Sequence, residues 1–122
     1  MDKKLEMSML FDFYGELLTE KQAEMVDLYY NEDLSLSEIA EPRGISRQGV
    51  RDSVVRGERQ LLALEEKLGL LARFLSIEKQ VGKIKESITE IRAYEAESIN
   101  NSKLRSMLLT LETELGRVID EV

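Results

Sequence analysis

The chain has 122 residues, of which 43% are hydrophobic, and its 17 basic and 24 acidic residues give a net charge of −7. This length allows one domain, or a small domain with an added helical arm, and the apolar content argues against disorder. Because neither cysteine nor histidine is present, the composition excludes disulfides, thiolate nucleophiles, imidazole bases and Cys/His zinc clusters.

The remaining composition indicates an all-α protein. One proline and seven glycines interrupt the chain, and no window alternates apolar and polar residues as a half-buried strand would. No apolar run approaches the ~20 residues of a membrane span, and the N-terminus is charged too often to be a secretory signal. With cysteine absent as well, we expect a soluble cytoplasmic protein that does not insert into a membrane.

The charge is distributed unevenly along the chain. Residues 1–42 have a net charge of −8 and residues 60–122 a net charge of −2, whereas residues 43–59 have a net charge of +3. A concentrated basic patch acts locally even on an acidic protein, because salt screens charges beyond a Debye length. The five arginines of this basic stretch are Arg43, Arg47, Arg51, Arg56 and Arg59.

Apolar residues at three- and four-residue spacing predict the first two helices at residues 3–17 and 20–31. Between them, Thr19 and Gln22 have the spacing of a capping box, in which the two side chains bond to each other's backbone N–H groups. The sequence therefore predicts a sharp start to the second helix.

A third and a fourth helix follow. Ser35 and Glu38 form a second capping box, and Pro42 limits the third helix to a short segment. The fourth helix is predicted at residues 46–68, with Ser46 as its cap and Gly69 as the left-handed residue after its end.

These two helices have the pattern of a helix-turn-helix motif. Such a motif needs a small residue at the helix contact, a turn residue that tolerates positive φ, and apolar residues beneath the second helix. Ala40 and Gly44 meet the first two needs, four residues apart, and Ile39, Ile45 and Val50 are the predicted apolar contacts.

The opposite side of the fourth helix carries the candidate nucleic-acid contacts. A recognition helix presents its first turns to the major groove, where Arg pairs with guanine and Gln with adenine, and further arginines hold phosphates. We predict that bases or phosphates are contacted by Arg47, Gln48 and Arg51. We predict that the DNA backbone is contacted by Arg43, Arg56 and Arg59. Ser46 is predicted to cap the helix, with its hydroxyl near the groove.

A solvated helix face is the alternative interpretation of these arginines, but the intact motif and the confined positive charge favour nucleic acid. Asp52 on the same face counts against phosphate binding. It either accepts a hydrogen bond from cytosine or pairs with Arg56, four residues on. Near the expected tip of a C-terminal helical hairpin, we interpret Glu95 and Glu97 as exposed, solvated carboxylates.

Residues 72–122 are predicted to form a helical hairpin, and residues 1–71 a helix-turn-helix domain with its motif at 35–56. Asn100 to Ser102 is the predicted turn, with Asn101 or Ser102 as the cap. The heptad-like spacing predicts coiled-coil packing, within or between chains, and we favour a homodimer through this arm. The stripes are Ile77, Val81, Ile84, Ile88 and Ile91, and Leu104, Leu108, Leu111, Leu115, Val118 and Val122.

Two resemblances follow from these residues. Leu18 to Glu65 resembles region four of bacterial sigma factors, a helix-turn-helix module that reads the −35 promoter element. Through FDFYGELLTEKQ, ISRQGVRD and a helical tail, the whole chain resembles the YlxM family. That resemblance implies a DNA-binding regulator, encoded beside the genes of the signal recognition particle GTPase and acting in that protein-targeting pathway.

The family pattern of the reading helix carries over to Ser46, Arg47, Gln48, Val50, Arg51 and Asp52. The chain departs from the sigma-like pattern at Pro42 and Arg43, where an apolar residue usually precedes the turn glycine. We still expect the same fold, because Ile39, Ile45 and Val50 remain as apolar contacts. The departure affects the angle between the two helices, and therefore how the second helix docks on DNA.

The leading hypothesis is a DNA-binding helix-turn-helix regulatory protein that acts as a homodimer on half-sites ~34 Å apart. The chain lacks the other sigma-factor regions and should not act as a sigma factor. The alternative is a protein adaptor, which binds the signal recognition particle GTPase or its RNA through its acidic first 42 residues and its helical arm, without sequence-specific DNA binding. Neither function requires a metal or a cofactor, and neither is enzymatic.

Overall fold

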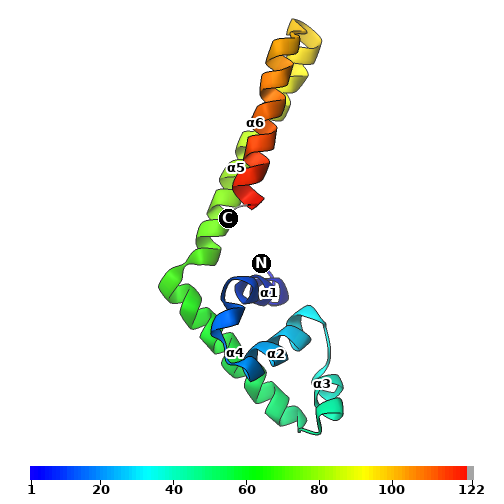
Figure 1. Cartoon of the computed structure of the whole chain (residues 1–122), viewed down its shortest axis with the longest axis vertical. Helices are drawn as coiled ribbons and strands as arrows, with labels where there is room; N and C mark the ends of the chain where they lie inside the picture. The colour runs from blue at the N-terminus through cyan, green and yellow to red at the C-terminus, as the bar shows by residue number, and fades with distance from the viewer. Residues whose placement is uncertain (121–122) are drawn as a thin grey trace. The chain divides into compact units, whose positions relative to one another are not determined.

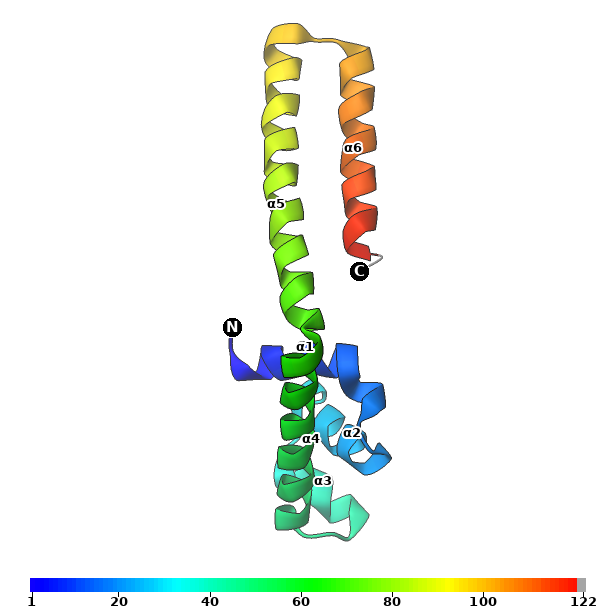
Figure 2. The same cartoon turned by 90° about the vertical axis from the view of Figure 1, so that its left-hand side faces the viewer.

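The computed structural model describes residues 1–120 and contains only helices and turns in that range (Figures 1 and 2). The prediction of an all-α fold is confirmed. None of the helices within these residues is long and apolar enough to cross a membrane. The helices are α1 (Lys3–Tyr14), α2 (Glu20–Val26), α3 (Leu36–Arg43), α4 (Arg47–Leu68), α5 (Leu70–Tyr94) and α6 (Ser102–Asp120).

Short irregular turns join some of these helices. A 3₁₀ turn, Gly15–Leu17, follows α1, and π-helical turns, Asp27–Asn31 and Glu95–Ile99, follow α2 and α5. The chain divides into two compact units, Met1–Leu71 and the residues from Ala72 onward. Val122, the last residue of the predicted apolar stripes, lies outside the described residues.

The predicted caps set the starts of three helices. Thr19 Oγ1 accepts from the backbone N–H of Gln22, and Ser35 Oγ from that of Glu38; in both capping boxes the longer side chain accepts in return from the cap residue's N–H. Ser46 Oγ accepts from the N–H of Gly49 at 2.9 Å. A cap of this kind stabilises a helix by about 1 kcal/mol, so these local contacts explain why the predicted boundaries are close to the observed ones.

Glycines in the left-handed conformation end α3 and α4. Gly44 has φ 64° and Gly69 has φ 63°, and the N–H of each bonds back to a carbonyl in the preceding turn. A side chain at either position would strain the backbone. Pro42 lies inside the last turn of α3, which confirms the prediction of a short third helix.

The core of the first unit forms where α4 packs against α1, α2 and α3 (Figure 1). One face of α4 supplies Val50, Val54, Gly57 and Leu61, spaced three and four residues apart, and all are buried. Residues from the other helices complete the core: Met7, Leu10, Tyr14, Met25, Val26, Tyr30, Ile39 and Ala40.

One predicted apolar contact of the motif is wrong. Ile45 is 37% exposed because it lies in the turn between Gly44 and Ser46, so Ile39 and Val50 bury the motif without it. Leu68 is 55% exposed because it is the last residue of α4. The chain turns at Gly69, and Leu71 occupies the buried position instead.

Tyr14 fixes the end of α4. Its hydroxyl donates to Glu65 Oε1 at 2.6 Å and accepts from the N–H of Leu70 at 3.0 Å. Glu65 Oε1 also accepts from the N–H of Leu71 at 3.0 Å. Burial raises the pKa of Tyr14, so its hydroxyl keeps the proton that it donates. These bonds occupy backbone donors that a helix start would otherwise leave without partners.

In the second unit, α5 and α6 run side by side in opposite directions (Figure 2). Val81, Ile88 and Leu108 are buried between them. Arg92 Nη1 donates to both carboxylate oxygens of Glu112 at 2.9 Å. The turn is capped by Asn101, whose Oδ1 accepts from the N–H of Leu104 at 3.0 Å, so the helices pair within the chain.

Glu95 corrects another expectation, because it is only 1% exposed. Arg105 donates to both of its carboxylate oxygens, from Nε at 2.8 Å and Nη2 at 3.1 Å, and Nη2 also donates to Asn100 Oδ1. The π-helical turn places the carboxylate against α6, which the sequence pattern did not indicate. Glu97 is exposed, as expected.

The pair makes the hairpin sensitive to acid. The hydrogen bond from Arg105 holds the pKa of Glu95 below its ordinary value of 4.5. Because the folded-state pKa is the lower one, the stabilisation is complete above the ordinary value and is lost as the pH falls through the lowered value. We expect Glu95→Gln to be less stable than wild type at pH 7, with the difference disappearing in acid.

Urea unfolding followed by circular dichroism, at neutral pH and again below the lowered pKa, measures this difference. Glu97→Gln removes the same charge from an exposed side chain and serves as the control. A difference between wild type and Glu95→Gln that stayed constant with pH would contradict the assignment.

Gly57 is the second test, because a Cβ atom there would lie 2.5 Å from Val26 Cγ2 on α2. We expect Gly57→Ala to lower the free energy of unfolding by about 1–3 kcal/mol, as other overpacked cores do. Gly82→Ala is the control, since a Cβ there meets no atom within 4 Å, and better helix propensity should make it neutral or stabilising by up to about 1 kcal/mol. Urea unfolding that found Gly57→Ala as stable as wild type would show that α2 and α4 do not need this close approach.

Candidate nucleic-acid interface

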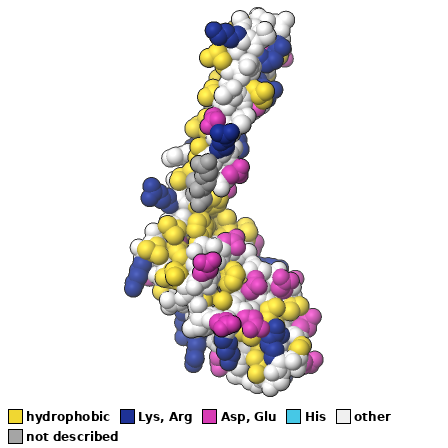
Figure 3. Space-filling view, viewed as in Figure 1, with side chains coloured by type: hydrophobic (Ala, Val, Ile, Leu, Met, Phe, Trp, Pro, Cys, Tyr) yellow, Lys and Arg dark blue, Asp and Glu magenta, His cyan; other side chains and the backbone are white. Residues whose placement is uncertain are grey.

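The side of α4 opposite the core is exposed and basic. Val50, Ser53, Val54 and Gly57 are buried. In the space-filling view, Lys and Arg side chains gather along the edge of the first unit that α4 forms, whereas Asp and Glu side chains spread over its front (Figure 3). The exposed residues that define this arginine face are Arg47, Gln48, Arg51, Arg56 and Arg59.

The start of α4 borders a hollow of about 420 Å³, lined by Leu36, Ser46, Arg47, Gln48 and Arg51. Leu36 begins α3, so the hollow lies where the two motif helices start. Four of its lining residues were predicted site residues. Leu36 was not, because its apolar side chain gave no signal of a binding site and only the approach of α3 to α4 places it there.

Gln48 has a partner on the same face. Its Nε2 donates to Asp52 Oδ1 at 2.9 Å, one helical turn away. The ion pair between Asp52 and Arg56, one of the two alternatives for this carboxylate, does not occur within the described residues, because the carboxylate bonds to Gln48, four residues earlier on the helix. Asp52 therefore orients the Gln48 amide and leaves the amide oxygen directed away from this bond.

Arg43 differs from the other arginines because it has partners inside the first unit. Its Nε donates to Glu24 Oε1 at 2.9 Å, and its Nη1 donates to the carbonyl of Ile39 at 3.0 Å. These bonds join the end of α3 to α2 and tie the guanidinium group to the backbone of α3 one turn earlier. Arg43 is thus held by the fold.

The other four arginines of residues 43–59 have no hydrogen-bond or ion-pair partner among residues 1–120. They are Arg47, Arg51, Arg56 and Arg59. Arg47 and Arg51 lie in the first two turns of α4, beside its N-terminus, where the helix dipole favours an anion. Arg56 and Arg59 lie about 14 and 18 Å further along the axis than Arg47, at ~1.5 Å per residue.

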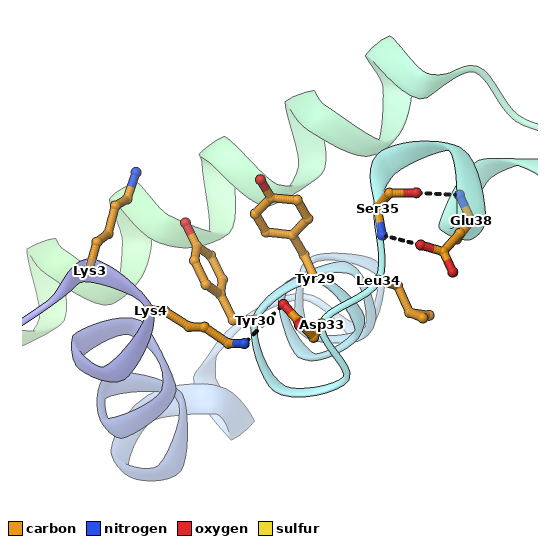
Figure 4. Close-up of a pocket in the computed structure, with 8 residues that line it drawn as sticks. All are labelled: Lys3, Lys4, Tyr29, Tyr30, Asp33, Leu34, Ser35 and Glu38. Atoms are coloured by element: carbon orange, nitrogen blue, oxygen red, sulfur yellow. Dashed lines mark hydrogen bonds and ion pairs between the residues drawn. The ribbon is translucent and has the colours of Figure 1, made fainter.

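A larger hollow, of about 520 Å³, lies on another side of the unit (Figure 4). Tyr29 and Tyr30 project into it beside Lys3 and Lys4. Lys4 Nζ is 2.9 Å from Asp33 Oδ1, and Lys3 pairs with Glu58. Because both ammonium groups are matched by carboxylates, this hollow has no surplus of positive charge for a polyanion.

Tyr30 also bonds to Glu58, on α4. Burial, followed by this hydrogen bond, raises the pKa of Tyr30, so its hydroxyl remains protonated as the donor. The tyrosine pair therefore belongs to the packing of α4. Among residues 1–120, no three acidic side chains are grouped so that they could hold a metal ion.

Comparisons with known proteins identify the family of the chain. The family described as "UPF0122: Putative helix-turn-helix protein, YlxM / p13 like" matches residues 1–114. A UPF0122 protein of Acetivibrio thermocellus is 47% identical over 120 residues, 98% of this chain and 99% of the relative. Relatives from Thermoanaerobacter sp. and Halalkalibacterium halodurans are 43% and 42% identical, over 99% and 93% of this chain and 97% of each relative.

The different surroundings of the arginines predict different effects on stability. We expect Arg43→Ala to lower the free energy of unfolding by about 1 kcal/mol, because it removes a carbonyl bond and an ion pair. Arg47→Ala and Arg51→Ala, which remove no hydrogen bond or ion pair to residues 1–120, should change it by less than about 0.5 kcal/mol. Urea unfolding of the three variants tests this, and equal effects would contradict the distinction.

Proposed function

Because the chain belongs to the UPF0122 family of helix-turn-helix proteins similar to YlxM and p13, we propose that it binds DNA through the arginine face of α4. The observation that carries the proposal is the set of unpaired arginines on the outer side of a capped helix whose inner side is buried. These four guanidinium groups have no carboxylate partner among residues 1–120. In a chain of net charge −7, they are available to an anionic partner.

The first turns of α4 read the sequence in this proposal. Arg47 and Arg51 contact guanine edges or phosphates, and Gln48 contacts a base through its amide oxygen, since its amide nitrogen donates to Asp52. Asp52 then acts as a support that fixes the amide plane of Gln48. The hydroxyl of Ser46 is used as the helix cap, and it lies at the wall of the same hollow.

The other basic residues have lesser roles. Arg56 and Arg59 hold the DNA backbone further along α4, as positioning contacts that carry no sequence information. Arg43 would have to leave Glu24 and Ile39 to reach a phosphate. We therefore give it a supporting role, in which it sets the angle of α3 against α2.

The biological setting comes from the family resemblance. We propose that the chain is a regulatory protein of the signal recognition particle pathway, as its resemblance to the YlxM family implies. We also propose that it acts as a homodimer, so that two helix-turn-helix units meet two half-sites, the arrangement that many regulators of this class use.

A second candidate function is favoured by a separate observation. Residues 1–42 have a net charge of −8, and most of their acidic side chains are exposed, over the front of the first unit (Figure 3). Such a surface suits a basic protein partner. In this alternative the chain is an adaptor that binds the signal recognition particle GTPase, and the arginine face holds its RNA or is only solvated.

Removing the first two arginines tests the DNA-binding proposal. We expect Arg47→Ala/Arg51→Ala to weaken binding to a labelled mixed-sequence duplex by at least about tenfold at low salt. The slope of log affinity against log salt should also decrease by about one for each phosphate that no longer meets an arginine. Fluorescence anisotropy at low and physiological salt measures both quantities.

Lys79→Ala/Lys85→Ala is the matched control, because it removes the same charge from exposed positions on α5. Equal weakening by the two double variants would show that only net charge matters and would overturn the assignment to α4. If wild type does not bind duplex DNA even at low salt, the adaptor becomes the better candidate, and binding to the purified GTPase should then be unaffected by the arginine substitutions.

A further inference from the structure

The hairpin of α5 and α6 leaves a row of large apolar side chains uncovered. On each helix the apolar residues occupy two alternating positions of a heptad. One set is buried between the two helices, as Val81, Ile88 and Leu108 are. In the other set, Ile84, Ile91, Leu111 and Val118 are between 42% and 52% exposed. Together with Met107, which is 56% exposed and lies one turn before Leu111, they form what we name the hairpin apolar face.

These residues lie on one side of the hairpin. At about 100° per residue, Ile84 and Ile91 lie to one side of the buried row of α5, and Arg92 lies to the other. On α6, Leu111 and Val118 likewise lie to one side of Leu108 and Leu115, and Glu112 lies to the other. Since Arg92 and Glu112 meet in an ion pair, the exposed apolar residues of both helices lie together on the opposite side.

The spacing on the two helices is self-complementary. Ile84 and Ile91 are seven residues apart on α5, and Leu111 and Val118 are seven apart on α6. The midpoints of the two pairs are level within about 3 Å, judged from the Arg92–Glu112 pair and ~1.5 Å per residue. A two-fold axis through both midpoints therefore places each apolar residue opposite its counterpart on another copy.

The charges beside the face fit the same axis. Lys83 and Glu90 on α5 are exposed and lie on opposite sides of the midpoint of its apolar pair. The axis therefore brings Lys83 of one copy within two residues, or ~3 Å along the helix, of Glu90 of the other. On α6, Glu114 and Arg117 form an ion pair within the chain beside the midpoint of the apolar pair on that helix, so these two charges are already balanced where the copies would meet. The small residue Ser87 lies beside the axis, where two copies of α5 would approach most closely.

We propose that a second copy of this chain covers the hairpin apolar face, which deepens the pairing of copies in the proposed function and rests on it. The two hairpins form a four-helix bundle with their tips at opposite ends, and α5 packs against α5 and α6 against α6. This arrangement buries both heptad positions, as four-helix bundles do. It also explains why a hairpin of only two helices carries a second row of apolar residues.

The available area is sufficient for a stable dimer. Two helices over the length of α6, about 28 Å by 20 Å, present a flat area on the order of 560 Å² on each copy. The corrugated surface of the side chains is larger, and stable interfaces bury roughly 600–1,000 Å² per partner. A nucleic acid would not cover this face, since it presents no surplus of positive charge to a phosphate backbone.

The full chain allows a matched test of the surface. We expect wild type to be a dimer in sedimentation equilibrium, Ile91→Asp/Leu111→Asp to be a monomer with unchanged helix content, and Leu109→Asp to remain a dimer. Leu109 is the control because it is 57% exposed but lies on another side of α6. A monomeric wild type, or a double variant that stays dimeric, would overturn the proposal.

A second variant tests the orientation without weakening the interface. The chain has no cysteine, so Ser87→Cys introduces a single thiol beside the proposed axis. Mild oxidation should produce a disulfide-linked dimer on a non-reducing gel, whereas Ser106→Cys, on the far side of α6, should remain uncrosslinked. Absence of the Ser87→Cys dimer, or equal crosslinking of both variants, would overturn the antiparallel arrangement.

These experiments distinguish the dimer proposal from the DNA-binding proposal, because different substitutions test each. Arg47→Ala/Arg51→Ala should leave the dimer mass unchanged, because both residues lie on α4. Ile91→Asp/Leu111→Asp should retain arginine-dependent, salt-dependent binding to duplex DNA, with lower apparent affinity because only one unit is engaged at a time. If the double variant is monomeric but keeps this DNA binding, the result supports the hairpin apolar face as the dimer interface, whichever DNA sequence is bound.

Discussion

The close packing of α4 onto the helices before it determines which of its residues face outward. Gly57 allows α2 to approach so near that a single Cβ atom would collide with Val26. With this face against the core, Val50 and Val54 are buried and the arginines are turned to solvent. A helix rotated by even one residue, about 100°, would bury charge and expose apolar side chains, so the candidate binding surface is a direct consequence of the core.

Electrostatics then separates basic residues that look alike in the sequence. Lys3, Lys4 and Arg43 each meet a carboxylate within the first unit, whereas Arg47 and Arg51 have no such partner among the described residues. In an acidic chain, an unpaired arginine retains its full attraction for an anion, while a paired one must first give up a contact. This difference, more than the count of positive charges, makes the start of α4 the best-supported contact.

The hairpin shows the same division between satisfied and unsatisfied groups, with apolar surface in place of charge. Its tip is closed by Glu95 and Arg105, and its inner row is buried between α5 and α6. Two helices can bury only one row of a two-row heptad pattern, so the second row has no partner within the hairpin. The polar groups at the turn of the hairpin therefore have partners, whereas the apolar residues along one side remain exposed.

The sequence by itself determined the helices and their ends, because caps, left-handed glycines and periodicity act over three to seven residues. Thr19, Ser35, Ser46, Gly44 and Gly69 behave as their neighbours in the chain indicate. Only the tertiary structure decided the burial of Glu95, the exposure of Ile45, the engagement of Arg43 and the place of Leu36 beside the reading helix. Each of these depends on how the helices and turns lie against one another, and spacing along one helix carries no record of which element packs against it.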